Sequence, residues 1–106
     1  MRRMAALPKE VEQHLEEIRK LCARSHVTRL MLLDETAPPF GGPVPDFVVE
    51  FEPHPDPLVR GRRYGDLWTG LVEMIGDVNL VVISSIKDPS RLREIQLAHH
   101  DIYAAA

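Results

Sequence analysis

The chain has 106 residues, which predicts one domain over residues 1–106 and leaves no room for a separate recognition domain. Leu, Ile, Val and Phe account for 31 of these residues, enough apolar side chain to exclude disorder of the whole chain. With 13 basic and 16 acidic residues the net charge is −3, so the chain lacks the excess of cations on which non-specific nucleic-acid binding depends.

The single cysteine, Cys22, permits no internal disulfide, and no Cys-x-x-Cys pair is present to build a zinc site. No apolar run is long enough to span a bilayer or to act as a secretory signal. We therefore expect a cytoplasmic protein without membrane contact. Cys22 falls on the apolar side of a predicted helix, with no charged neighbour to stabilise a thiolate, and is interpreted as a core residue.

The first predicted element is an amphipathic helix from Pro8 to about Ser25, because apolar residues recur there at steps of three and four. Residues 27–33 (VTRLMLL) predict a buried strand. Residues 46–52 (DFVVEFE) predict a second strand, with aromatic and aliphatic side chains on one face and carboxylates on the other. The Pro- and Gly-rich segment between the two strands predicts a wide hairpin connection.

After the second strand, the closely spaced prolines of residues 53–57 predict a break in regular structure. A second helix is expected from about Asp66 to Ile75, ending at Gly76. Residues 78–83 predict a third strand. The pair Asp88-Pro89 predicts the start of a last helix that continues through His99 and Ile102.

The predicted order is therefore α-β-β-α-β-α, an α/β (α+β) fold in which helices pack on a small, three-stranded mixed sheet. The residues expected to be largely buried are Val11, Leu15, Ile18, Leu30, Leu32, Val49, Phe51, Leu71, Ile75, Leu80, Val82, Leu92 and Ile95.

Five segments cover nearly the whole chain in this order: IRKLCARSHVTRLMLL, DFVVEFEP, GDLWTGLVEMIG, GDVNLVVISSIKDP and a closing IYA. Their order and spacing resemble the minimal nucleotidyltransferases (MNT) of the DNA polymerase β superfamily, small prokaryotic domains often paired with HEPN-type partners. The resemblance implies a nucleotidyltransferase-like fold. It also implies a site in which a Gly-Ser turn holds the triphosphate and three aspartates bind Mg²⁺.

The resemblance places the three carboxylate positions of such enzymes at Val44, Asp46 and Asn79, so only Asp46 remains acidic. The Gly-Ser positions fall at Leu32 and Leu33, or at Leu33 and Asp34 after a shift of one residue. The arginine near that turn in the family corresponds to Thr36. Magnesium requires oxygen ligands, and nucleotidyl transfer depends on charge neutralisation, so we expect a degenerate site with no catalytic residue, cofactor or nucleotide.

Other residues are candidates for a replacement metal site or for a partner-binding site. Asp34, Asp46 and Glu50 are the acids that a rebuilt metal site would use, although four residues of strand separate Asp46 from Glu50 by about 13 Å. Arg60, Arg62, Arg63 and Tyr64 form either a cationic patch for RNA or a solvated turn. Trp68 borders the predicted core and is either a partner anchor or a side chain folded over the sheet's edge. No two of the five histidines have the i, i+4 spacing of a helical metal site.

The leading hypothesis from the sequence is a pseudoenzyme: a nucleotidyltransferase-like antitoxin or regulatory protein that binds a helical HEPN-type partner. The candidate partner-binding residues are Trp68, Arg62 and Arg63. The alternative is a weak or altered nucleotidyltransferase that uses Mg²⁺ on Asp46. A third hypothesis is a structural domain that binds itself.

Overall fold

The computed structural model describes residues 7–33, 44–97 and 99–105. Its helices are α1 (Lys9–Gln13), α2 (Leu15–Arg24), α3 (Pro57–Ile75) and α4 (Pro89–Leu97), with a 3-10 turn at Ile83–Ser85. Its strands are β1 (Val27–Leu33), β2 (Asp46–Phe51), β3 (Asn79–Val82) and β4 (His99–Ala104). The hairpin connection and its Asp34, Thr36, Gly41 and Gly42 lie outside the described residues.

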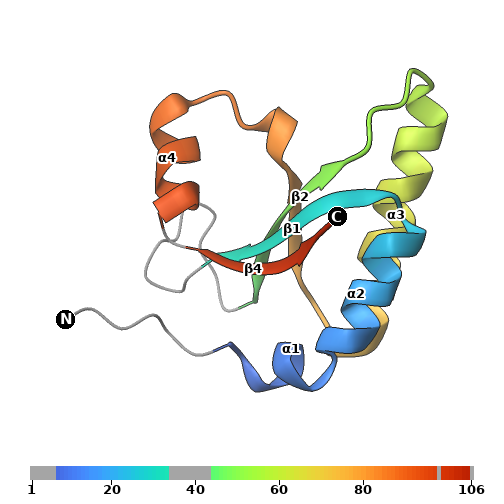
Figure 1. The fold of residues 1–106 in the computed structure, drawn as a ribbon, viewed down its shortest axis with the longest axis vertical. Helices are drawn as coiled ribbons and strands as arrows, with labels where there is room; N and C mark the ends of the chain where they lie inside the picture. The colour runs from blue at the N-terminus through green and yellow to red at the C-terminus, as the bar shows by residue number, and fades with distance from the viewer. Residues whose placement is uncertain (1–6, 34–43, 98, 106) are drawn as a thin grey trace.

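The four strands form one mixed sheet in the order β3-β2-β1-β4 (Figure 1). β1 is antiparallel to both β2 and β4, whereas β2 and β3 are parallel and are connected through α3. The predicted pairing of the first two strands is confirmed, with Leu32 opposite Phe47.

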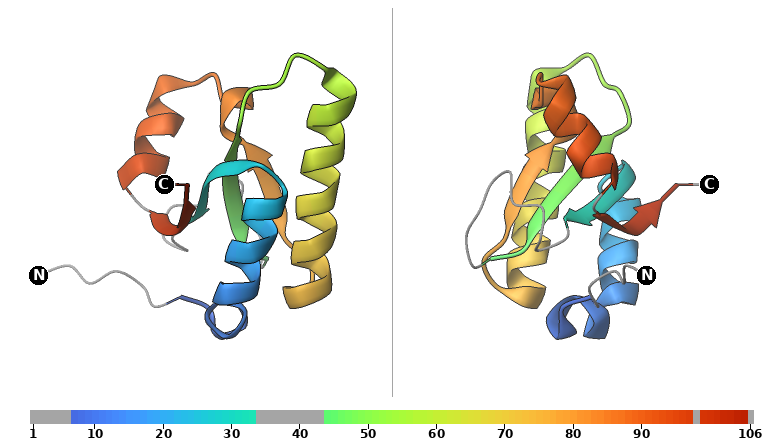
Figure 2. Two further views of the ribbon diagram at one scale, coloured as in Figure 1. Left: turned by 45° about the vertical axis from the view of Figure 1, so that its right-hand side comes forward. Right: turned by 90° about the vertical axis from the view of Figure 1, so that its left-hand side faces the viewer.

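Helices cover both faces of this sheet (Figure 2). On one face α1, α2 and α3 enclose a core around Leu30, Leu32 and Phe47. On the other face α4 and the 3-10 turn enclose a second, smaller core around Met31 and Val48. Val48 lies on the same face of β2 as the strand's carboxylates, and it is buried because this second face is also covered.

The predicted first helix is interrupted at His14, which separates α1 from α2. The His14 side chain donates from Nδ1 to the Glu10 carbonyl oxygen at 2.9 Å, taking the acceptor that the His14 backbone N–H would use in a continuous helix. That N–H bonds instead to the Val11 carbonyl oxygen at 3.2 Å. Local competition between side chain and backbone therefore divides the helix.

The second predicted helix begins nine residues too late in the sequence interpretation. α3 begins at Pro57, because the Asp56 side chain accepts a hydrogen bond from the Leu58 N–H at 2.9 Å and Pro57 occupies the first helical position. Its end at Gly76 is confirmed, and Gly76 has a φ of 87°, which favours glycine. Residues 60–64 consequently lie within a helix rather than a turn.

The last predicted helix continued too far. α4 ends at Leu97, and His99–Ala104 forms β4 along the otherwise open edge of β1. The sheet therefore has four strands rather than three. Ile102, which the sequence interpretation placed on the last helix, is buried in the main core as part of β4.

Eight of the thirteen predicted core residues are buried. The other five are half-buried, at the ends of elements or beside the main cores: Leu15, Phe51, Ile75, Val82 and Leu92.

Candidate functional site

The residues that the resemblance assigned to magnesium binding meet at the first residues of two parallel strands. Asp46 begins β2 and Asn79 begins β3, and the ladder places them directly side by side. The Asn79 amide Nδ2 donates a hydrogen bond to Asp46 Oδ1 at 2.7 Å. The Asn79 backbone N–H also donates to the Pro45 carbonyl oxygen at 2.9 Å. Side chain and main chain thus join the two strands at the same place.

This arrangement does not fit a pair of magnesium ions. Asp46 supplies one carboxylate, and the neighbouring amide of Asn79 presents its N–H to that carboxylate rather than an oxygen to a cation. Val44 is half-buried two residues earlier and has no oxygen in its side chain. Across residues 7–33, 44–97 and 99–105, no group of three or more His, Cys, Asp or Glu side chains is placed to hold a metal ion.

The positions that the resemblance assigned to the phosphate-binding turn, Leu32 and Leu33, lie inside a regular strand. Leu32 and Leu33 are 2% and 6% exposed. β1 is paired with β2 on one side and with β4 on the other, so the ladders engage its backbone groups. Phosphate binding requires free backbone N–H groups that a ligand can approach closely, and neither condition is met at these two leucines.

The acids of the rebuilt metal site do not come together in the described chain. Glu50 lies near the far end of β2 from Asp46, and its carboxylate accepts a hydrogen bond from the Thr28 hydroxyl at 2.9 Å. Asp34 lies outside the described residues. A site that combines Asp46 with Glu50 therefore has no geometric support.

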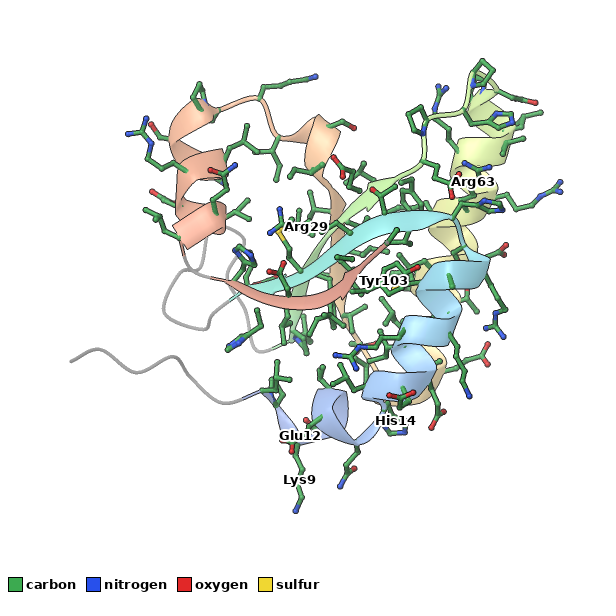
Figure 3. The ribbon with its side chains drawn as sticks, viewed as in Figure 1. Lys9, Glu12, His14, Arg29, Arg63 and Tyr103 are labelled. Carbon is green, nitrogen blue, oxygen red and sulfur yellow. The ribbon has the colours of Figure 1, made fainter. Side chains whose placement is uncertain are left out.

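The arginines of the basic cluster point to different sides of α3. Arg60 donates to the His54 carbonyl oxygen at 2.7 Å, and Arg63 (Figure 3) donates to the Glu52 carbonyl oxygen at 3.1 Å. Both hold the chain that leads from β2 into the helix. Arg62 is exposed and makes no hydrogen bond or ion pair with the described residues. The cluster is thus not one patch.

The three candidate partner-binding residues differ in exposure. Arg62 and Trp68 are exposed on the outer side of α3, whereas Arg63 is half-buried and occupied with the β2 end. Trp68 is 43% exposed, which places it at the border of core and surface as predicted.

Two further groups of residues were missed by the sequence interpretation. A cavity of about 500 Å³ lies at the carboxyl ends of β2 and β3, and Phe51, Tyr64 and Val82 are among its lining residues. At β4, Arg29 (Figure 3) donates to Asp101 Oδ1 from Nε at 3.1 Å and from Nη2 at 3.0 Å. No sequence pattern indicated either group. The cavity needs the early start of α3, the ion pair needs β4, and neither of these was predicted.

Cys22 lies in the main core, as predicted. Its burial raises the pKa of the thiol to about 12, so the thiolate is not formed near neutral pH. A nucleophilic role for this cysteine is therefore excluded by its surroundings.

No helix in the part of the chain that the structure describes is both long and apolar enough to cross a bilayer.

No protein-family model and no curated protein sequence matches this chain. Solved structures of toxin–antitoxin complexes do match it. One is a complex of a tri-AMPylated HEPN toxin from Shewanella oneidensis with its MNT antitoxin, matched with a TM-score of 0.56 and 16% identity over 89% of this chain and 72% of that chain. Another is a mutant of the MntA–HpeT toxin–antitoxin pair, with a TM-score of 0.55 and 15% identity over 86% of this chain and 73% of that chain.

A third match is a toxin–antitoxin complex with AMP-PNP, with a TM-score of 0.54 and 16% identity over 86% of this chain and 73% of that chain. At this level of identity the likeness concerns the fold. The chain therefore has the α+β, nucleotidyltransferase-like fold of the MNT antitoxins found in complexes with HEPN toxins.

Proposed function

We propose that this chain is a catalytically degenerate nucleotidyltransferase-fold protein that acts as the antitoxin-like, regulatory partner of a helical HEPN-type protein. Two lines of argument support the proposal. The fold is that of antitoxins solved in complex with HEPN toxins. At the positions that the resemblance assigns to the chemistry, two of the three carboxylates and the Gly-Ser turn that nucleotidyl transfer needs are replaced by other residues.

The observation that carries the proposal is the hydrogen bond from Asn79 Nδ2 to Asp46 Oδ1 at 2.7 Å. In a metal site, neighbouring carboxylates repel each other until cations neutralise them. Here a neutral amide donates directly to the one carboxylate, so this end of the sheet is satisfied without a cation. A protein whose task is to bind a partner gains from a scaffold that is complete without metal.

The chemical half of the proposal is tested with the purified chain, Mg²⁺ and ATP labelled at the α-phosphate. We expect no label on the chain itself or on an added HEPN-type protein. Label transfer that is lost on Asp46→Ala would instead support the alternative, a weak Mg²⁺-dependent nucleotidyltransferase. Glu50→Gln is the matched control, because Glu50 is an exposed acid of the same strand that bonds to Thr28.

The binding half is tested by co-expression with an adjacent reading frame that encodes an all-helical protein. We expect a stable complex whose elution and mass are unchanged by EDTA, because the proposed association needs neither metal nor nucleotide. Absence of such a complex, or a complex that forms only with Mg²⁺-ATP, contradicts the proposal. A cytoplasmic location belongs to the same proposal, and a lone, buried cysteine is compatible with a reducing compartment.

A further inference from the structure

One side of α3 is not covered by any described part of the chain. In Figure 2 the helix stands at the outer flank of the molecule, with α2 and the sheet on its inner side. Three large apolar side chains are exposed in the described residues, and two of them belong to this helix: Leu58, 80% exposed, and Trp68, 43% exposed. Exposed apolar surface of this kind on a helix is typical of a site that contacts another molecule.

The residues on this side follow the spacing of a helix–helix seam. The steps between them alternate three, four, three and four along the outer side: Leu58, Gly61, Gly65, Trp68 and Val72. Val72 forms the edge of this side, because it is half-buried and also packs against the main core. This is the alternation by which two helices pack side chains into one another. We call these five residues the α3 seam.

The two glycines of the α3 seam have no explanation within the described chain. A Cβ atom at Gly61 or Gly65 would meet no atom within 4 Å, although glycine weakens a helix relative to alanine. Gly70 of the same helix differs, because a Cβ atom there would lie 2.5 Å from Leu21 Cδ2 on α2. Packing inside the molecule thus accounts for Gly70 but leaves the seam glycines open to an approaching partner.

We propose that the α3 seam binds the α3 seam of a second copy of this chain, in an antiparallel pair related by a two-fold axis. In an antiparallel pair, a residue late in one helix faces a residue early in the other helix. The register that places Trp68 over Gly65 of the second copy also places Val72 over Gly61 of the second copy. Each large side chain then fills the space that a glycine leaves.

The charges beside the seam favour the same arrangement. Arg62 and Glu73 are eleven residues apart, so they lie on the same flank of the helix about three turns from each other. Both are exposed, and neither makes an ion pair with the described residues. In this register Arg62 is level with position 71 of the second copy, so Glu73 of the second copy lies two residues away, about 3 Å along the helix axis, on the facing flank. The two-fold axis repeats this pair. A parallel register would instead place glycine against glycine and separate these charges.

The size of the seam sets the strength of the dimer. α3 has 19 residues and is therefore about 28 Å long. Two such helices in contact bury on the order of 1,000 Å² in total, the low end for specific interfaces. We therefore expect a reversible dimer with a dissociation constant in the micromolar range. The inference goes beyond the proposed function, and it assigns Trp68 and Arg62, two of the candidate partner-binding residues, to the contact with the second copy.

The test is sedimentation velocity of the full chain from about 1 to about 300 µM, a range that brackets a micromolar dissociation constant. Trp68 is the only tryptophan, so its fluorescence reports the same equilibrium. We expect the dimer fraction to rise with concentration while the emission shifts to shorter wavelength. Gly65→Leu should weaken the dimer by at least about tenfold, because it fills the space of the facing Trp68.

Loss of folding does not explain such a result, because the space around Gly65 in the single chain is open and leucine is a better helix former than glycine. Arg62→Glu should also weaken the dimer, and adding Glu73→Arg should restore it. Leu97→Ser, which removes an exposed apolar side chain from α4, is the control and should leave the equilibrium unchanged. A chain that is monomeric throughout, or a dimer that Gly65→Leu does not weaken, overturns the inference.

Discussion

Gly70 and Gly65 belong to the same helix, and alanine is expected to have opposite effects on stability at the two positions. At Gly70 a Cβ atom would lie 2.5 Å from Leu21 Cδ2 and 2.9 Å from Leu21 Cδ1. Leu21 is only 4% exposed and cannot turn aside into solvent. Extra methyl groups in a packed core cost about 1–3 kcal/mol, whereas replacing glycine in a helix regains about 1 kcal/mol. Gly70→Ala should therefore lower the free energy of unfolding by up to about 2 kcal/mol.

Gly65→Ala should gain the same helix propensity without the steric cost, because no atom lies within 4 Å of the added Cβ atom. It should raise the free energy of unfolding by about 0.5–1 kcal/mol. Urea unfolding at or below about 1 µM protein, followed by circular dichroism, measures both variants where association does not contribute. Gly70→Ala in a Leu21→Ala background should recover most of the helix gain, because its steric partner is shortened. Equal stabilisation by both alanines would refute the described contact between α2 and α3.

Three further predictions concern the core, the Asp46–Asn79 site and the ion pair of β4. Leu71→Ala should lower the free energy of unfolding by about 2–5 kcal/mol in the same urea assay, because Leu71 is fully buried. Val44→Asp combined with Asn79→Asp should raise magnesium affinity in calorimetry without creating nucleotidyl transfer, because the phosphate-binding turn is still missing. Partial burial would raise the pKa of Asp101, but the hydrogen bonds and charge of Arg29, with a smaller effect of a neighbouring histidine, hold it below the ordinary 3.8. A carboxyl group with a lowered pKa stabilises the folded state above pH 3.8, and this stabilisation is lost as the pH falls through the folded-state pKa. The loss of stability caused by Arg29→Leu should therefore become smaller below pH 3.8.

The sequence predicts β1 in full because residues 27–33 are apolar and β-branched over the length of one buried strand. It fails at the start of α3 because three prolines in five residues favour a loop, while only Pro57 follows a side chain that caps a helix. Asp56-Pro57 is the same pair as Asp88-Pro89, whose role was correctly predicted. The two pairs differ in their neighbours, because further prolines stand close to Asp56-Pro57 and favour a loop there.

β4 fails for a different reason. Six residues are too few to separate a strand from the last turns of a helix by spacing alone, and Ile102 fits the buried side of either. The open edge of β1 decides the outcome, and this edge exists only after the sheet has formed. The Arg29–Asp101 pair could not be foreseen for the same reason, because its residues are 72 positions apart in the chain.

At the candidate site, the resemblance singled out Asp46 and Asn79, and the strand register determines how these two residues meet. Asp46 and Asn79 meet because β2 and β3 are parallel and start at the same level. A second carboxylate at position 79 would face Asp46 at hydrogen-bonding distance, and the strand ends would need a cation to hold them together. The amide instead links the strands through its own N–H, beside the backbone bond to Pro45. The pairing of β2 with β3 is therefore held by the chain's own hydrogen bonds and needs no metal ion at this end of the sheet.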